Sequence, residues 1–489
     1  MIRYAIALAL AAACLASPAF ATPTSPYVRG ICPDTVAVDE RIECGDLTVP
    51  ENRGKPDSRT LSLPVMIFHS RSAAPAPDPV IFLPGGPGGS SVANKHSGKQ
   101  NPFIETRDYI LLEPRGAKMA TPALDCPGIN AVKGEISAGH HRTDADAILI
   151  KAAAKCRADL TGQGIDLDGY TSAETAQDIE DLRVALGIGQ WNVIGHSYGT
   201  RLALTYLRDH PQGIRSVLLD SVLPPEANFD ESATANLWRA LHVVFDNCAT
   251  SSACHAAYPH LPQDFAALIE HADRAPLNTA PSIRGSDNKP VTSSGAEVVD
   301  AIYSALHNPD QIGQIPAIIE GALAGRTDKL AALIKDNQGP SSFTWGLRLS
   351  IWCAEEMPFE KPSLVEAQTS ADWGLGGIDE RTASVGMCQA WHVAAADAKE
   401  AAPVVSDVPV LVMSGEFDPD TPPDWGRSLT KTMPNARVVL MPGRSHGAGF
   451  NRCGGTIELA FINEPKAALD TSCALSMRGA DMADGIDPN

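Results

Sequence analysis

Apolar and polar positions along the chain predict strands that alternate with helices. Two early segments, Glu43–Pro50 and Arg59–Phe68, alternate apolar and polar residues as half-buried strands do. Four later runs are typical of buried strands, at residues 79–83, 108–112, 191–194 and 216–220. A capped amphipathic helix is predicted from Thr171, and a second helical pattern follows Arg201. This alternation predicts a doubly wound, mainly parallel sheet.

The alternating pattern stops at Pro224-Pro225, and strands return at 409–413 and 437–441. The stretch between has helical patterns at 238–245, 265–269 and 312–330. We interpret it as a mostly helical cap inserted over the carboxyl ends of the strands, where it would shape a substrate pocket and exclude water. The expected α/β architecture therefore has a first core part at 22–225, a cap at 226–402 and a second core part at 403–489.

A catalytic motif lies where the strand at 191–194 meets the next helix. Gly195-His-Ser197-Tyr-Gly199 matches the G-x-S-x-G nucleophile elbow, a sharp turn that presents a serine at a helix N-terminus. Glycines fit at 195 and 199 because the chain passes too close to itself for a Cβ. Ser197 is therefore the predicted nucleophile, and a turn without chemistry is the alternative. We expect the ring of His196 to point away from the site and to be packed behind the catalytic residues.

Two later loops supply the partners that a serine nucleophile needs. The first returning strand runs into a loop that contains Glu416, Asp418 and Asp420, and the second runs into a loop with His446. Serine, acid and histidine follow each other in this chain order in elbow hydrolases. We assign His446 as general base and Asp418 as the acid that orients it. Glu416 and Asp420 compete for the acid role.

A glycine-rich loop, Pro84-Gly85-Gly86-Pro87-Gly88-Gly89, follows the strand at 79–83. It lacks the Lys-Ser/Thr of a P-loop and the spacing of a dinucleotide site. We interpret it as one side of an oxyanion hole, which in elbow hydrolases combines this loop with the residue after the nucleophile. The predicted donors are the backbone N–H groups of Gly86, with Gly85 as the alternative, and of Tyr198.

The N-terminal 21 residues are predicted to be a secretory signal peptide. Arg3 precedes an apolar run, and Ala19-Phe20-Ala21 is a cleavage site with the cut after Ala21. A secreted or periplasmic location follows, with a lipoprotein anchored through Cys14 as the second alternative. No later segment is predicted to span a membrane. The formal charge of −19 argues against nucleic acid or an anionic membrane surface as a partner.

Ten of the eleven cysteines remain after the signal peptide is removed. An even number in an exported chain suggests disulfides, whereas the C-x2-C spacing typical of zinc sites does not occur. Our hypothesis pairs each cysteine with its neighbour in chain order, as Cys32–Cys44, Cys126–Cys156, Cys248–Cys254, Cys353–Cys388 and Cys453–Cys473. No metal and no organic cofactor is expected.

Four motifs together resemble the secreted tripeptidyl aminopeptidase branch of the proline iminopeptidase family: Pro84-Gly-Gly-Pro-Gly88, Gly195-His-Ser-Tyr-Gly199, Phe417-Asp418-Pro-Asp-Thr-Pro422 and Ser445-His446-Gly447. The resemblance covers nearly the whole mature chain. It implies the α/β-hydrolase fold with a TAP-like C-terminal part. In two places the chain departs from the family: Pro84 replaces a usual His, and residues 113–120 lack the second Gly and the Ser of D-x-R-G-x-G-x-S.

The resemblance implies that residues, either tripeptides or single residues such as proline, are removed from free peptide N-termini. Such an exopeptidase needs an anion for the α-ammonium group of its substrate. We expect Glu355 in this role, with Glu356 second, and a solvated acidic pair is the alternative. An exported carboxylesterase or lipase with the same triad is the alternative function, and a binding protein without activity would need a broken triad. The oligomeric state is not predicted.

Overall fold

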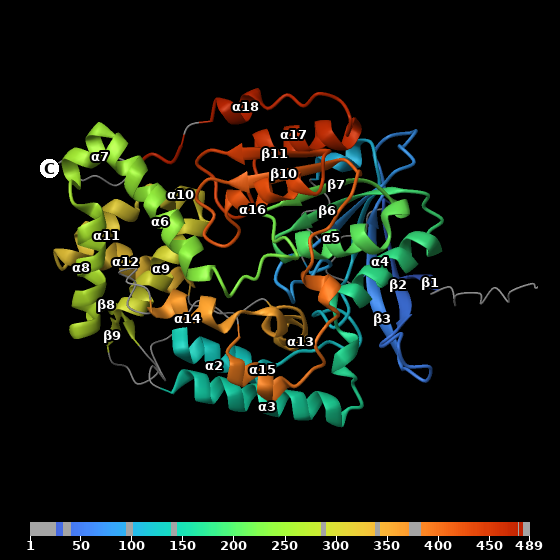
Figure 1. Cartoon of the computed structure of the whole chain (residues 1–489), viewed down its shortest axis with the longest axis horizontal. Helices are drawn as coiled ribbons and strands as arrows, with labels where there is room; N and C mark the ends of the chain where they lie inside the picture. Colours follow the sequence, from blue (N-terminus) through green and yellow to red (C-terminus); the bar gives the residue numbers. More distant parts are fainter. Residues whose placement is uncertain are drawn as a thin grey trace, which may run out of the picture.

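One nine-stranded sheet forms the centre of the molecule (Figure 1). The computed structural model describes residues 26–32, 41–93, 101–137, 144–284, 290–337, 343–370, 383–477 and 479–482, so the predicted signal peptide lies outside the described residues. The strand order is β1-β2-β3-β5-β4-β6-β7-β10-β11. The strands are β1 (Tyr27–Gly30), β2 (Ile42–Pro50), β3 (Thr60–Phe68), β4 (Val80–Leu83), β5 (Tyr109–Leu112), β6 (Trp191–His196), β7 (Ile214–Asp220), β10 (Val410–Gly415) and β11 (Ala436–Met441).

The sheet changes from antiparallel to parallel at β5. Strands β1, β2, β3 and β5 pair antiparallel, and every neighbouring pair from β5 to β11 is parallel. Along the parallel strands both faces are apolar: Val193 and Val217 belong to one hydrophobic cluster, and Ile194 and Leu218 belong to another. Fully apolar strands of this kind are stable where helices cover both faces. The predicted mainly parallel α/β-hydrolase sheet is therefore confirmed.

Helices cover the sheet on its two sides (Figure 1). Helix α5 packs on β6 and β7, and α16 and α17 lie on opposite sides of β10. Helix α4 begins after Thr171, whose hydroxyl accepts a hydrogen bond from the Glu174 N–H, as the capped pattern predicts. These helices are α2 (Pro127–Ser137), α3 (Ala145–Gly162), α4 (Ser172–Ala185), α5 (Tyr198–Asp209), α16 (Pro423–Ser428), α17 (Arg452–Asn463) and α18 (Ser472–Leu475).

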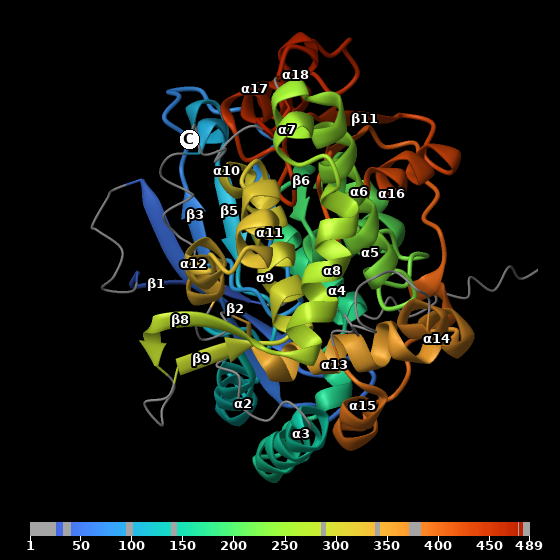
Figure 2. The same cartoon turned by 90° about the vertical axis from the view of Figure 1, so that its left-hand side faces the viewer.

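The chain between β7 and β10 is mostly helical and supplies a second hydrophobic cluster, whose members run from Leu237 to Ile334 and which also includes Phe417 and Met482. Figure 2 shows α6, α8, α9 and α11 packed side by side. The elements are α6 (Ala233–Thr250), α7 (Ser252–Ala257), α8 (Leu261–Arg274), β8 (Leu277–Arg284), β9 (Pro290–Ser293), α9 (Gly295–His307), α10 (Pro309–Ile312), α11 (Ile315–Leu323), α12 (Asp328–Asn337), α13 (Trp345–Glu355), α14 (Pro362–Ser370) and α15 (Val385–Trp391). The cap boundaries at 226 and 402 stay a prediction.

The inserted stretch differs from its predicted pattern in three ways. The antiparallel hairpin β8–β9 was not predicted. The helical pattern at 312–330 is broken after Leu323, where Gly325 adopts a φ of 80° before α12 begins. The second half also packs differently, because Trp345 and Trp391 belong to the same cluster as Val193 and Val217 of the main sheet rather than to the cluster of the first half.

All five disulfides of the chain-order hypothesis are present. Each closes a local loop, with sequence separations between 6 and 35 residues. Cys353–Cys388 joins α13 to α15 within the inserted stretch. Disulfides of this number are typical of proteins that fold in an oxidising compartment.

Candidate active site

The turn between β6 and α5 has the backbone of a nucleophile elbow. Ser197 is held at φ 56° and ψ −128°, a strained conformation for a residue with a side chain. A Cβ on Gly195 would lie 2.4 Å from the Gly199 carbonyl oxygen, and one on Gly199 would lie 2.2 Å from the Leu83 oxygen. The predicted need for glycine at both positions is confirmed, because strand and helix pass in direct backbone contact.

Asp418 and His446 form a hydrogen-bonded pair at the ends of β10 and β11. The Nδ1 atom of His446 lies 3.1 and 3.0 Å from the two carboxylate oxygens of Asp418. The Asp418 side chain is fully buried, and it also accepts hydrogen bonds from Thr421 and from the Asp420 backbone. Because Nδ1 faces a carboxylate, it carries the proton, and Nε2 is left as the basic atom.

In the Asp418–His446 pair, charge and hydrogen bonding together shift the two pKa values more than burial does. Burial alone would lower the pKa of His446, but the charge and hydrogen bond of Asp418 raise it above its ordinary value. Burial would likewise raise the pKa of Asp418, and the charge of His446 lowers it. Asp418 thus stays a carboxylate, which is the state that an orienting acid needs.

The contact between Ser197 and His446 stays a prediction. Within the described part of the chain, no hydrogen bond of 3.5 Å or less joins the Ser197 hydroxyl to the imidazole. Such bonds are often long before a substrate binds. The neighbouring residue corrects one expectation: the His196 ring does not point away, but packs against the His446 ring with centroids 5.2 Å apart.

The glycine-rich loop lies directly against the elbow. A Cβ on Gly85 would lie 2.9 Å from the Ser197 Cβ. Gly86 has a φ of 129°, which favours glycine. Among the described residues, neither the Gly86 nor the Tyr198 amide donates to a backbone carbonyl. Both predicted oxyanion donors are therefore available, and their role stays a prediction.

Glu355 and Glu356 both have partners inside the protein. The Glu355 carboxylate accepts hydrogen bonds of 2.6 Å from the Ser172 N–H and hydroxyl, and burial raises its pKa to about 7. Glu356 is 1% exposed and forms an ion pair with buried Arg201. Both side chains are buried, so the alternative of a solvated acidic pair is excluded. Their predicted role in binding the substrate amine is not tested by these contacts.

The loop that carries His446 is braced from β7, a feature that the sequence did not reveal. Ser221, at φ 61°, accepts a hydrogen bond of 2.8 Å from the Gly447 N–H. The buried Asp220 carboxylate accepts one from Gly449, and burial raises its pKa to about 7. Two consecutive residues at the end of β7 thus fix the backbone on the C-terminal side of the histidine.

The acid loop is braced from the inserted helices, a second feature missed from the sequence. Arg239 of α6 donates hydrogen bonds to the backbone oxygens of Glu416 (3.0 Å) and Asp418 (2.5 Å). From α9, Tyr303 donates to the Asp420 carboxylate, and His307 Nε2 lies 3.0 Å from its second oxygen. No local pattern marks these residues, because their partners lie more than 100 positions away.

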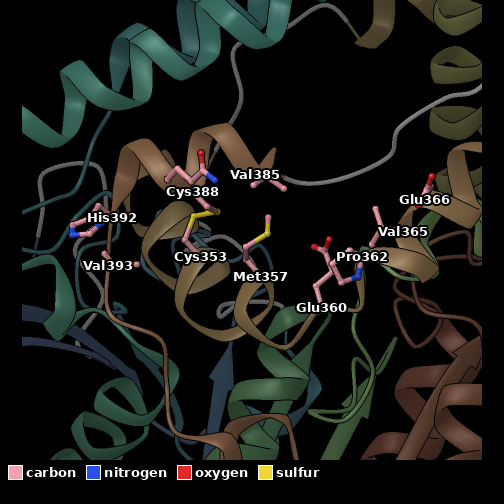
Figure 3. Close-up of a pocket in the computed structure, with 11 residues that line it drawn as sticks. Cys353, Met357, Glu360, Pro362, Val365, Glu366, Val385, Cys388, His392 and Val393 are labelled. Carbon is pink, nitrogen blue, oxygen red and sulfur yellow. A yellow bond between two sulfur atoms is a disulfide. The ribbon is translucent and has the colours of Figure 1, made fainter.

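A pocket of about 700 Å³ lies between α13, α14 and α15 (Figure 3). The Cys353–Cys388 disulfide, Met357 and Val365 contribute to its wall. Its lining includes neither Ser197 nor Asp418 nor His446, so it is separate from the predicted chemistry. Beside the oxyanion loop, Gly85, Tyr198 and Ile351 help to enclose a cavity of about 10 Å³, room for one water molecule.

Neither a metal-ligand cluster nor a membrane-spanning helix is found among the described residues. In that part of the chain no group of three or more His, Cys, Asp or Glu side chains is placed to hold a metal ion. None of its helices combines the length and the apolar character that crossing a bilayer requires.

Comparison with known proteins identifies the class. A family model described as the alpha/beta hydrolase fold matches residues 78–245, and one described as TAP-like protein matches 378–473. The serine protease Hip1 of Mycobacterium tuberculosis is 24% identical over 435 residues, 83% of this chain and 82% of that protein. The tripeptidyl aminopeptidase of Streptomyces lividans is 30% identical over 206 residues, 39% of this chain and 38% of that protein. The proline iminopeptidase of Xylella fastidiosa is 27% identical over 158 residues, covering 32% and 36%.

Fold and elbow together define a serine hydrolase of the α/β-hydrolase fold. Within that class, residues 378–473 match the TAP-like family model, and the relatives that the chain resembles are named as a serine protease and a tripeptidyl aminopeptidase. The resemblance stated from the four motifs is therefore confirmed.

Proposed function

We propose that this protein is an exported serine exopeptidase that removes tripeptides, or single residues such as proline, from free peptide N-termini. The buried Asp418–His446 pair beside a serine elbow is the observation that carries the proposal. It is supported by the names of the relatives, which include a tripeptidyl aminopeptidase and a proline iminopeptidase. The five disulfides and the predicted signal peptide support export to the periplasm or beyond.

The proposed mechanism is a two-step acyl transfer. Ser197 attacks the scissile carbonyl while His446 Nε2 takes its proton, and Asp418 stabilises the imidazolium. The oxyanion accepts hydrogen bonds from the Gly86 and Tyr198 amides. His446 then gives the proton to the leaving amine, and a water molecule, activated by the same histidine, hydrolyses the acyl-enzyme.

The free N-terminus of the substrate requires an anion, and Glu355 is the better candidate of the two glutamates. Arg201 forms an ion pair with Glu356 and also lies near enough to Glu355 to lower its pKa, against the larger effect of burial. The hydrogen bonds that Glu355 accepts come from Ser172, whose backbone N–H and hydroxyl are neutral donors. The Ser172 hydroxyl in turn lies 2.6 Å from the Tyr198 hydroxyl. These hydrogen bonds connect Glu355, through Ser172, to Tyr198, whose backbone amide is proposed to bind the oxyanion.

A substrate panel tests the proposed function. Coumarin amides of single residues, of proline and of tripeptides are compared with their N-acetylated forms and with short-chain p-nitrophenyl esters. A free-amine substrate is expected to have a kcat/KM at least tenfold above that of its blocked form, because one lost buried charge pair costs about 2 kcal/mol or more. Turnover of esters alone, with no amide cleaved, would contradict the exopeptidase proposal.

Replacing Glu355 with glutamine tests the amine site. Because glutamine keeps the volume but not the charge, kcat/KM for free-amine substrates is expected to fall on the order of a hundredfold, while that for blocked esters changes little. Glu270→Gln is the matched control, because this glutamate is exposed on α8 of the same insertion. Equal losses on both substrate types would remove Glu355 from amine binding and leave it as a partner of Ser172.

An exported carboxylesterase with the same triad is the alternative function. The family models do not distinguish it, because the alpha/beta hydrolase description covers both activities. It predicts high turnover of the short-chain esters and indifference to a free amine, so the same panel separates the two functions.

A further inference from the structure

A second histidine–carboxylate pair lies beside the first. Asp420 Oδ2 is 3.0 Å from His307 Nε2 and 4.0 Å from His446 Nδ1. The rings of His307 and His446 are 5.7 Å apart between centroids. His307 is the last residue of α9, so this pair joins the inserted segment to the loop that carries Asp418.

The contacts of His307 determine its protonation state. Its Nδ1 atom lies 2.9 Å from the backbone oxygen of Tyr303, and its Nε2 faces the Asp420 carboxylate. Both partners are acceptors, whereas a neutral imidazole carries a single N–H. An imidazolium therefore satisfies both contacts, and the C-terminus of α9 favours a positive charge. Burial would lower the pKa of His307, but the charge of Asp420 raises it.

We propose that His307 is a positioning residue of the catalytic relay: held as an imidazolium, it neutralises Asp420 and leaves Asp418 as the effective carboxylate partner of His446. The proposal rests on the proposed function only in that Ser197 and His446 form the relay. It also explains why two carboxylates within 4.0 Å of one imidazole do not compete for it.

Two consequences for the general base follow. An uncompensated Asp420 charge would stabilise the His446 imidazolium, and a base that stays protonated cannot accept the serine proton. The position of the Asp420 backbone also affects Asp418, because the Asp420 N–H donates a 2.9 Å hydrogen bond to Asp418 Oδ1. Holding the Asp420 side chain from α9 thus also holds the orienting acid in place.

Other titratable groups around His446 come from each neighbouring element. Asp418 and Asp420 follow β10, Asp220 ends β7, and His196 ends β6. Burial lowers the pKa of His196 to about 3, so this ring is neutral near pH 7. Two arginines add positive charge: Arg239 of α6 donates to the backbone oxygen of Asp418, and Arg348 of α13 interacts with the charge of Asp420. His307 is the cation that contacts the Asp420 carboxylate directly.

The test is the pH profile of kcat/KM for p-nitrophenyl acetate, a substrate with no amine to recognise. His307→Gln keeps an N–H donor toward Asp420 but removes the charge. The acid limb is expected to move upward by about one pH unit, because a lost cation near 6 Å makes His446 harder to deprotonate. The double variant with Asp420→Asn removes both charges and should return the midpoint close to that of the wild type. His255→Gln, exposed on α7, should leave it unchanged.

An unmoved acid limb in His307→Gln would overturn the proposal, as would a shift that persists in the double variant. If the variants do not fold, ¹⁵N NMR of the wild-type protein tests the same point: both ring nitrogens of His307 should be protonated at pH 7, and a neutral tautomer would overturn it. A wild-type enzyme that hydrolyses the ester but no peptide amide contradicts the exopeptidase function alone and leaves this test intact.

Discussion

Replacing Ser197 with alanine is expected to lower kcat by roughly a million-fold on every substrate, because the members of a serine relay act as a unit. The acyl-enzyme cannot form without the hydroxyl, and the residual rate then comes from the oxyanion donors and from substrate binding. Active-site labelling with a fluorophosphonate should be lost in parallel. The measurement is single-turnover hydrolysis of the best amide and ester of the panel.

Folding of the Ser197→Ala variant must be shown separately. The residue lies at φ 56°, and alanine at that position carries the same backbone strain as serine, so its stability to urea should be close to that of the wild type. Ser363→Ala, at an exposed position of α14, serves as the matched control. Turnover of the Ser197→Ala variant within tenfold of the control would exclude the elbow serine as nucleophile.

The parts of the fold that were predictable are those whose information is local. Buried strands need continuous apolar runs, and the elbow needs glycine at 195 and 199, where a Cβ would collide with backbone. The disulfides followed from chain order because each closes a short loop. Strand ends in a parallel sheet meet at one edge, which is why Asp418 and His446 could be placed together from motifs 28 residues apart.

The contacts made by the insertion were not predictable, because they join residues far apart in the chain. Arg239 and His307 carry no motif, and their role appears when α6 and α9 are packed against the acid loop. The broken helix at Gly325 and the ring contact of His196 with His446 also depend on tertiary packing. Sequence named Asp418 as the orienting acid and Asp420 as its competitor, and the distances to His446 Nδ1 of 3.0 Å and 4.0 Å favour Asp418.

The hydrogen bonds of Asp418 show what an asparagine would do in its place. Oδ1 accepts from two backbone N–H groups, those of Asp420 and Thr421, at 2.9 Å each. An asparagine side chain would keep its oxygen there, since both groups are fixed donors. Its NH₂ would then occupy the Oδ2 position, 3.0 Å from His446 Nδ1.

Asp418→Asn is therefore expected to lower kcat by about ten-thousandfold near neutral pH. The new amide donates to His446 Nδ1, which forces the proton onto Nε2, and that nitrogen can no longer accept the proton of Ser197. Single-turnover kinetics on the best amide measures the loss. Glu416→Gln, which replaces the other competing acid, is the control. Its kcat should stay within a few-fold of the wild type, because the Glu416 carboxylate accepts a hydrogen bond from the Gly443 N–H rather than from the histidine. The reverse result, a large loss at 416 and a small one at 418, would transfer the orienting role to Glu416.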